Sequence, residues 1–308
     1  LIVGFIKPVI ALYVLVFSML LSPEIVLSGG QGTGTNRGVT IRVDDLLIVL
    51  IGLTWIAKIA ILKNIGLFKK TPLNKSISFY CIVVTLATLL GIFMDRVRPD
   101  LGFLYVLKYI EYFIIYFMAA NIIQTDKDIN KFIFAIFLTC FITCIVALMQ
   151  IPSDGRVTAP FEGVEGEPNT FGGYLMVLGV LSSAILLNMK IKKYLWLLIP
   201  LIVLILITLL FTLSRSSWVA SIPALFTLFV FSKKKLSMSI VIVAALIIAP
   251  LAVPQKVTDR LFKTFTKDSL SRKVGGIVLD GSTSERIRDN IEAIEDWTKH
   301  PIFGFGVT

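Results

Sequence analysis

Apolar runs long enough to cross a membrane recur along most of this 308-residue sequence. A transmembrane helix needs about 20 consecutive apolar residues. The runs lack the alternation of a membrane β-strand, and backbone groups in lipid must pair within their own segment, so helices are expected. The sequence predicts nine spans, at residues 2–21, 44–62, 77–94, 101–123, 132–151, 170–189, 194–213, 216–231 and 237–253.

The predicted fold class is an all-α integral membrane protein, with a polytopic helical bundle over residues 1–253 and a non-membrane segment over 254–308. Only 16% of the residues are charged, against about 25% in a typical soluble protein, so the lipid bilayer is an expected partner. The net charge of +10 does not indicate nucleic-acid binding, because many lysines lie in short clusters between apolar runs.

The lysine clusters predict the orientation in the membrane. Loops 63–76, 190–193 and 233–235 are rich in lysine and fall on the same side of the predicted bundle. The loops on the opposite side hold most of the acidic residues. Positive residues prefer the cytoplasmic side, so we expect 152–169 and 254–308 to face outward.

The outer segment contains an amphipathic pattern. Ser282 and Glu285 have the spacing of a capping box, and Pro301 ends the pattern, so a helix is expected over 283–299. We expect this helix to lie over the outer mouth of the bundle with its apolar stripe turned inward, away from water. The stripe consists of Ile287, Ile291, Ile294 and Trp297.

Arg215 is the most informative single residue, because it joins two apolar runs with almost no loop to hold it in water. An arginine at bilayer depth costs roughly 2.5–3.5 kcal/mol and usually faces a cavity or a partner. The competing interpretation is a side chain that extends to the membrane interface. We favour a binding role for Arg215.

Other polar residues have functional and structural interpretations that the sequence leaves open. Arg156 could bind a ligand or be a solvated loop charge, and Asn169 could bind a ligand or cap the helix that follows it. Lys108 and Glu111 lie three residues apart on one helical face, as a possible intramembrane ion pair or substrate contact.

The arginines of the outer segment, Arg260 and Arg286 among them, could bind an anion or simply form a charged helix face. The chain has one histidine, so the sequence holds no metal site of the Cys/His kind. We therefore expect no metal in the site.

Short motifs occur in a fixed order from about residue 40 to the end of the chain. They include Gly155-Arg156, Ala159-Pro160, Pro168-Asn169, Thr212-Leu213-Ser214-Arg215-Ser216, Asp259-Arg260-Leu261, Thr264-Phe265, Asp280-Gly281-Ser282, Arg286 and Pro301-Ile302-Phe303-Gly304-Phe305-Gly306. This ordered set resembles the O-antigen ligase and polymerase family.

The resemblance implies a bundle of roughly a dozen helices in the bacterial inner (plasma) membrane, with a large outer loop. It implies a glycosyltransferase that takes a glycan from a polyprenyl-pyrophosphate carrier and joins it to a glycan, lipid or protein acceptor during cell-surface polysaccharide assembly. No cofactor or metal is implied. The expected substrate-binding residues, for pyrophosphate or glycan, are Arg215, Arg286, Arg156, Arg260 and Asn169.

One element of the family pattern is not found. The family's candidate general-base histidine follows the Gly-x-Gly element, whereas His300 precedes it and the sequence ends at Thr308. The expected base therefore lies beyond Thr308. The first residue is Leu1 rather than methionine, and we expect the sequence to lack residues at both ends.

A transporter or flippase for a lipid-linked or anionic solute is the alternative function. Such proteins often contain inverted repeats with helices broken near the membrane midplane. Here the polar features gather at the outer helix ends and no internal repeat is evident. A purely structural scaffold would leave Arg215 without an explanation.

Overall fold

A computed structural model describes most of the chain. The described residues are 7–26, 40–62, 70–153, 155–160, 166–188, 195–235, 255–262, 272–274, 277–279, 281–301 and 304. Statements about structure below refer to these residues.

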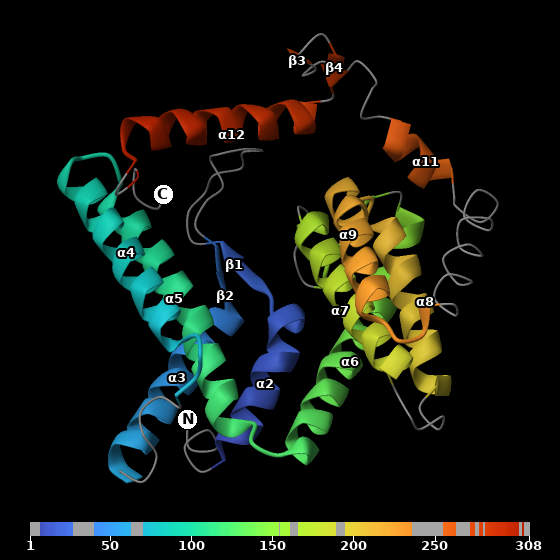
Figure 1. The fold of residues 1–308 in the computed structure, drawn as a ribbon, viewed down its shortest axis with the longest axis horizontal. Coiled ribbons are helices and arrows are strands. Elements are labelled where there is room, and N and C mark those ends of the chain that lie inside the picture. Colours follow the sequence, from blue (N-terminus) through green and yellow to red (C-terminus); the bar gives the residue numbers. More distant parts are fainter. Residues whose placement is uncertain are drawn as a thin grey trace. The chain divides into compact units, whose positions relative to one another are not determined.

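The long apolar runs form helices at the expected places (Figure 1). Residues 44–62, for example, were expected to be one span, and the helix there covers Val43–Leu62. The ninth run, 237–253, lies outside the described residues. The eight helices are α2 (Pro8–Leu21), α3 (Val43–Leu62), α4 (Asn74–Phe93), α5 (Pro99–Ile122), α6 (Asp126–Leu148), α7 (Pro168–Asn188), α8 (Leu195–Phe211) and α9 (Arg215–Phe231).

Four of these helices, α4 to α7, are both long enough and apolar enough to cross a membrane, and α2, α8 and α9 are shorter apolar helices. The helical membrane fold is therefore confirmed. The number of nine spans stays a prediction, as does the division into a bundle over 1–253 and an outer segment over 254–308.

Helices dominate, as expected for an all-α membrane fold, and two short strand pairs accompany them. Strand β1 (Glu24–Val26) pairs with β2 (Thr40–Arg42), and β3 (Arg272–Val274) pairs antiparallel with β4 (Ile277–Leu279). Between β3 and β4 the sequence reads Gly275-Gly276, a composition typical of two-residue hairpin loops that the search for apolar runs overlooked.

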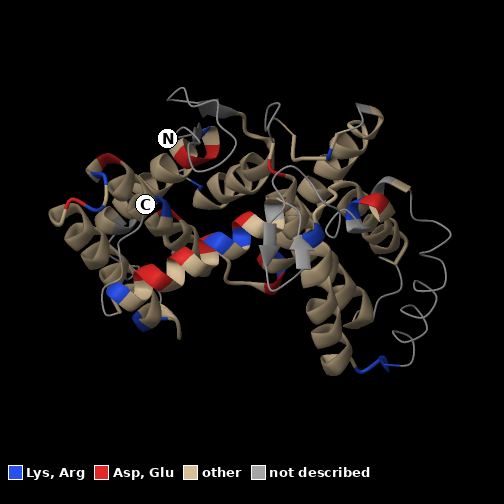
Figure 2. Ribbon diagram, turned by 90° about the horizontal axis from the view of Figure 1, so that it is seen from above, with Lys and Arg blue, Asp and Glu red and all other residues tan. Residues whose placement is uncertain are grey.

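The segment after residue 254 also contains helices α11 (Gln255–Phe262) and α12 (Gly281–Lys299). Helix α12 confirms the amphipathic helix expected over 283–299. Its apolar stripe is not buried as expected, because Ile291, Ile294 and Trp297 are 50%, 60% and 61% exposed. After Glu285, the charged residues of α12 are grouped by sign, with Arg286 and Arg288 near its start, acidic residues from Asp289 to Asp296, and Lys299 at its end (Figure 2).

The chain divides into two compact units, each with its own apolar core. Unit 1 comprises residues 1–18, 25–132 and 267–308. In it α5 packs against α3 and α4. Its core includes residues of four helices, and Met118 at its centre is fully buried. The core residues of unit 1 are Leu12, Leu15, Ile48, Trp55, Phe117, Met118 and Phe132.

Unit 2 comprises residues 19–24 and 133–266, and α7 packs there against both α8 and α9. Cys140 and Cys144, one turn apart, are fully buried in its core as small apolar residues. Further core residues are Ala147, Val157, Ala159, Phe171, Leu175, Leu178, Leu198, Leu201, Ile205 and Leu209.

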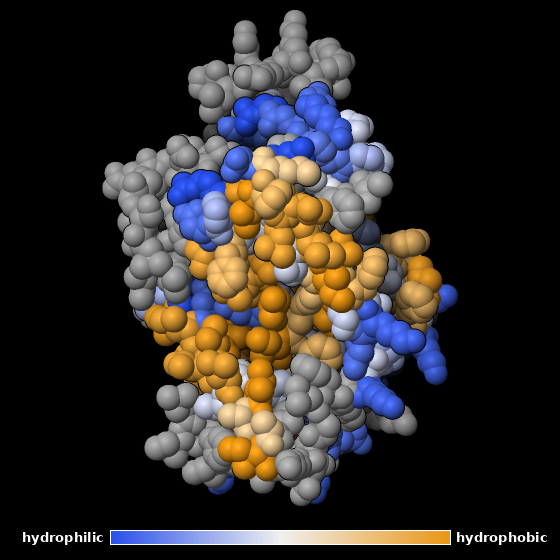
Figure 3. Space-filling model, turned by 90° about the vertical axis from the view of Figure 1, so that its left-hand side faces the viewer, coloured by the Kyte–Doolittle hydropathy of each residue, from blue (hydrophilic) through white to orange (hydrophobic). Residues whose placement is uncertain are grey.

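Large apolar side chains also cover the outside of the helices. Phe93 of α4 is 89% exposed, and only 11% of the most apolar window of α4 is buried. Figure 3 shows the apolar side chains gathered in a band, with hydrophilic side chains near the top of the view. Lipid contact accounts for such a surface, since an exposed apolar band is costly in water.

Candidate functional site

The connection between α8 and α9 is three residues long and almost entirely buried. Helix α8 ends at Phe211 and α9 begins at Arg215. Thr212 and Ser214 between them are fully buried, and Leu213 has a φ of 51°. The tight turn expected between these apolar runs is therefore confirmed. A leucine with positive φ is strained, which marks the turn as a place that surrounding contacts must hold.

Arg156 holds this turn from a loop that lies far away in the sequence. Its Nε donates a hydrogen bond to the carbonyl oxygen of Thr212 at 3.0 Å, and its Nη2 donates to that of Leu213 at 3.4 Å. The last carbonyls of a helix have no partners within the helix, and they form its negative end. The guanidinium therefore caps the C-terminus of α8.

Asn169 links the same arginine to the start of α9. Its side-chain Oδ1 accepts hydrogen bonds from Nη2 of Arg156 at 2.9 Å and from Oγ of Ser214 at 3.0 Å. Asn169 is the second residue of α7, after Pro168, so it is not the N-cap that the capping interpretation required. Its side chain instead joins three segments of unit 2.

Two further contacts fix the loop and the turn, and sequence reasoning missed both. Gln150 pairs with the backbone of Thr158: Thr158 N donates to Oε1 at 3.0 Å, and Nε2 donates to the Thr158 oxygen at 3.2 Å. Trp218 donates its indole N–H to the Leu209 carbonyl at 3.1 Å. In the sequence, Gln150 and Trp218 are recognisable merely as side chains with a polar group near the end of an apolar run, which does not indicate their partners.

Close packing between α7 and α9 also depends on a glycine. A Cβ added at Gly172 would lie 2.6 Å from Oγ of Ser217 and 3.1 Å from Cβ of Ser214. The next residue, Gly173, has open space at the same position. Gly172 thus lets α7 approach the serine-rich first turn of α9, where Oγ of Ser214 lies 2.9 Å from Oγ of Ser217.

Arg215 is the first residue of α9, and it is half-buried. The first N–H groups of a helix lack intrahelical partners and form its positive end, so an anion is stabilised there. A guanidinium at the same position adds a permanent charge and a planar fork that matches phosphate. The start of α9 is therefore suited to hold an anion.

The other predicted arginines lie elsewhere. Arg260 is on α11, which belongs to unit 2. Arg286 is exposed on α12 in unit 1, where no ion pair of Arg286 is found among the described residues. Its neighbour Arg288 pairs with Asp289 at 3.4 Å and with Glu292 at 3.5 Å. A joint role of these arginines with Arg215 stays a prediction.

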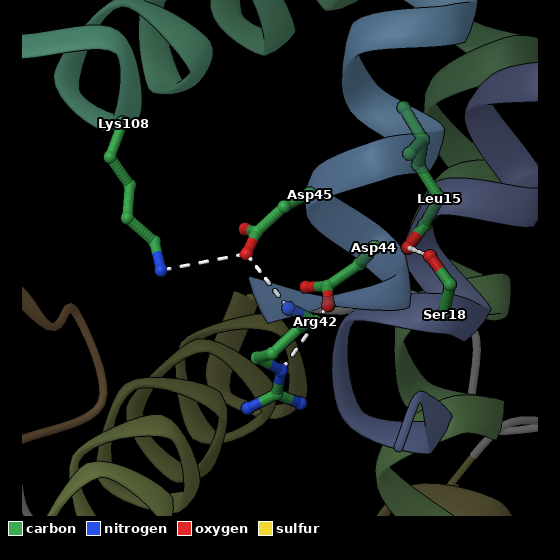
Figure 4. A network of polar contacts seen from close by, with 6 residues as sticks. All are labelled: Leu15, Ser18, Arg42, Asp44, Asp45 and Lys108. Atoms are coloured by element: carbon green, nitrogen blue, oxygen red, sulfur yellow. Dashed lines mark hydrogen bonds and ion pairs between the residues drawn. The ribbon is translucent and has the colours of Figure 1, made fainter. Parts of the chain in front are cut away.

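Lys108 has an ion pair that the sequence did not indicate. Its Nζ lies 3.5 Å from Oδ2 of Asp45, near the start of α3. Figure 4 shows Asp45 also accepting a hydrogen bond from the backbone N of Arg42, whose Nε contacts Asp44. Among the described residues no salt bridge within 4 Å joins Lys108 to Glu111, and a functional role of this pair stays a prediction.

Comparison with known proteins gives one match. Residues 200–308 match a family model described as O-Antigen ligase. This part of the chain contains most of α8, the turn that Arg156 caps, all of α9 and α12. A search of curated proteins and a search of solved structures found no match.

Proposed function

We propose that this chain belongs to the O-antigen ligase family, whose model residues 200–308 match, and that it is a membrane glycosyltransferase that transfers a glycan from a polyprenyl-pyrophosphate carrier to an acceptor hydroxyl. The family match supports a ligase or polymerase role in polysaccharide assembly, and the apolar helices support a membrane location. The carrier, the extracytoplasmic face and independence from a metal are parts of the proposal.

The start of α9 is the observation that carries this proposal. When a glycan leaves its pyrophosphate carrier, negative charge develops on the leaving oxygen. Arg215 at the positive end of α9 can stabilise that charge, and partial burial strengthens the interaction by keeping water away. We therefore assign Arg215 to the pyrophosphate.

Arg156 and Asn169 serve this site in our proposal by positioning it. Nε and Nη2 of Arg156 already donate to protein acceptors, which favours a supporting role over direct contact with the substrate. Through those bonds Arg156 and Asn169 fix the turn that carries Arg215. Catalysis depends on donors that are held in place before charge develops, so a loose turn would weaken the site.

Arg286 is the second arginine that we assign to the pyrophosphate, because it matches the family motif and no ion pair neutralises it within the described residues. Arg288, in contrast, forms ion pairs with Asp289 and Glu292 of its own helix, which partly neutralise its charge. Arg260 is retained as a candidate on the family motif alone. The acceptor needs a general base, which the resemblance places in a histidine after the Gly-x-Gly element.

Transfer activity of the full-length protein tests the assignment of Arg215. In proteoliposomes with a lipid-pyrophosphate oligosaccharide and an acceptor, we expect Arg215→Lys to lose at least about tenfold in rate, because lysine keeps the charge but lacks the fork. Arg98→Lys is the matched control, since Arg98 is exposed and, among the described residues, forms its ion pair with nearby Asp100. Equal insertion must be verified. Full activity of Arg215→Lys would reject the assignment.

The two arginines of α12 provide a second comparison. A charged hydrogen bond is worth roughly 1.5–3 kcal/mol, or about tenfold to a hundredfold in rate. We expect Arg286→Ala to lose at least about tenfold in transfer, and Arg288→Ala to lose less. Equal activity of the two variants would remove Arg286 from the proposed site.

A further inference from the structure

A pocket of about 240 Å³ in unit 1 lies between the end of α4 and the C-terminal end of α12. It belongs to no part of the proposed transfer site. Both helix ends are fixed by backbone hydrogen bonds: Arg96 N donates to Gly91 O at 2.9 Å, and His300 N donates to Asp296 O at 3.1 Å. The lining residues are Leu90, Gly91, Met94, Arg96, Lys299, His300, Pro301 and Gly304.

The polar part of the lining is basic. Arg96 comes from the α4 side, and Lys299 and His300 come from the α12 side. None of the described lining residues is acidic. Two permanent positive charges and an imidazole around one small volume favour an anion, and phosphate oxygens accept hydrogen bonds from all three side chains.

The apolar part of the lining continues onto the lipid-facing surface of α4. Met94 lines the pocket and is 52% exposed. Leu86, Leu89 and Phe93 of the same helix are also exposed. Because α4 is a candidate membrane span, these side chains face hydrocarbon. The pocket therefore lies at the end of a candidate membrane span, and its lining combines cationic and apolar side chains.

The exposed end of α12 fits the same environment. Trp297 precedes His300 by one helical turn and is 61% exposed. Tryptophan is enriched at the boundary between lipid and water, because one side of its ring is apolar and the N–H is polar. A pocket between α4 and this end of α12 would lie at the depth of the lipid headgroups.

We propose that this pocket binds the phosphate of an anionic membrane lipid, whose acyl chains lie along α4. Arg96, Lys299 and His300 hold the phosphate, and Leu90 and Met94 contact the first part of the chain. A soluble phosphate ester offers the same charged group but no chain. The proposal requires both parts, so a lipid must bind more tightly than inorganic phosphate does.

Lipid binding to the purified full-length protein tests this proposal. Native mass spectrometry in mixed micelles would measure the apparent Kd for phosphatidylglycerol, phosphatidylcholine and inorganic phosphate. We expect phosphatidylglycerol to bind best. Lys299→Gln and Arg96→Gln should each weaken its binding about tenfold or more, since each removes a charged hydrogen bond. Arg98→Gln, which removes the same charge two residues from Arg96, should leave the Kd unchanged.

Several results would overturn the proposal. Equal binding of phosphatidylglycerol and phosphatidylcholine would show that the negative charge is not recognised. Inorganic phosphate binding as tightly as the lipid would show that the chain contributes nothing. An equal loss in Arg98→Gln would indicate general surface electrostatics. Lys299 is exposed at a helix end, so Lys299→Gln should fold even if Arg96→Gln does not.

Discussion

The turns α4–α5 and α8–α9 both contain a residue with an unfavourable backbone conformation, but different contacts hold the two turns in place. Each connects two apolar helices, and each contains a non-glycine residue with positive φ, Asp95 at 55° and Leu213 at 51°. The α4–α5 turn is closed by its own backbone, because Arg96 N and Val97 N both donate to Gly91 O. The α8–α9 turn also has a backbone hydrogen bond, from Leu213 N to Leu210 O at 3.1 Å, and to this it adds the side-chain contacts of Arg156 and Asn169.

The residue types sharpen the contrast. Aspartate visits the left-handed region more readily than most residues, since its short polar side chain can bond to nearby backbone. Leucine has no such compensation, and a sparsely populated backbone conformation costs roughly 1–3 kcal/mol. In the α8–α9 turn, side chains that are distant in the sequence therefore help to hold the strained conformation. The turn that we assign to function is the one that depends on long-range contacts.

The largest expected effect comes from removing the long-range cap. Arg156→Gln loses the hydrogen bonds to Thr212 and Leu213 and leaves buried carbonyls without a donor. We expect a loss of roughly 2–4 kcal/mol in stability and a fall of at least about tenfold in glycan transfer. Thermal unfolding in detergent and the transfer assay would measure the two effects.

The matched substitution in the other turn is Arg98→Gln, which breaks only an exposed pair. Its unfolding temperature should stay close to that of the unmodified protein. If Arg156→Gln and Arg98→Gln shifted the unfolding temperature equally, the distinction between the two turns would be lost.

An intermediate effect is expected at the contact between α7 and α9. Gly172→Ala places a Cβ 2.6 Å from Oγ of Ser217 and 3.1 Å from the Cβ atoms of Ser214 and Ser217, so the hydroxyl must rotate and the first turn of α9 must shift slightly. Overpacking of this kind costs typically 1–3 kcal/mol. Gly173→Ala meets nothing within 4 Å and should be neutral or stabilising by up to about 1 kcal/mol, because alanine favours a helix.

Thermal unfolding of the two alanine variants under identical conditions would decide this point. A larger loss for Gly173→Ala than for Gly172→Ala would mean that α7 and α9 are not in close contact at Ser217.

The smallest effect on stability is expected for a substitution at the exposed surface next to the α4–α5 turn. Asp100→Asn removes the ion pair between Oδ2 of Asp100 and Nη2 of Arg98, two atoms that lie 2.7 Å apart. The side chain of Arg98 is 73% exposed and that of Asp100 is 57% exposed. Exposed pairs contribute about 0–1 kcal/mol. We expect a change below about 1 kcal/mol by thermal unfolding, and transfer activity within twofold. A loss comparable to that of Arg156→Gln would contradict a turn closed by its own backbone.

The sequence alone determined where the helices lie and which ends of them are polar. Long apolar runs force helices because lipid offers no hydrogen bonds to the backbone. The same pattern placed Arg215 at the junction of two helices, and the ordered motifs around it indicated the family that residues 200–308 match. These features depend on short stretches of neighbouring residues.

Only the tertiary structure decided what the other polar side chains contact. Arg156 caps a helix 56 residues away, Asn169 joins that cap instead of its own helix, and Lys108 pairs with Asp45. Likewise, the apolar stripe of α12 is predictable from the sequence, whereas its exposure is not. Each of these contacts depends on which segments lie close together in the folded protein. Contacts between residues far apart in the sequence produce no periodic pattern, so they could not be predicted from the sequence alone.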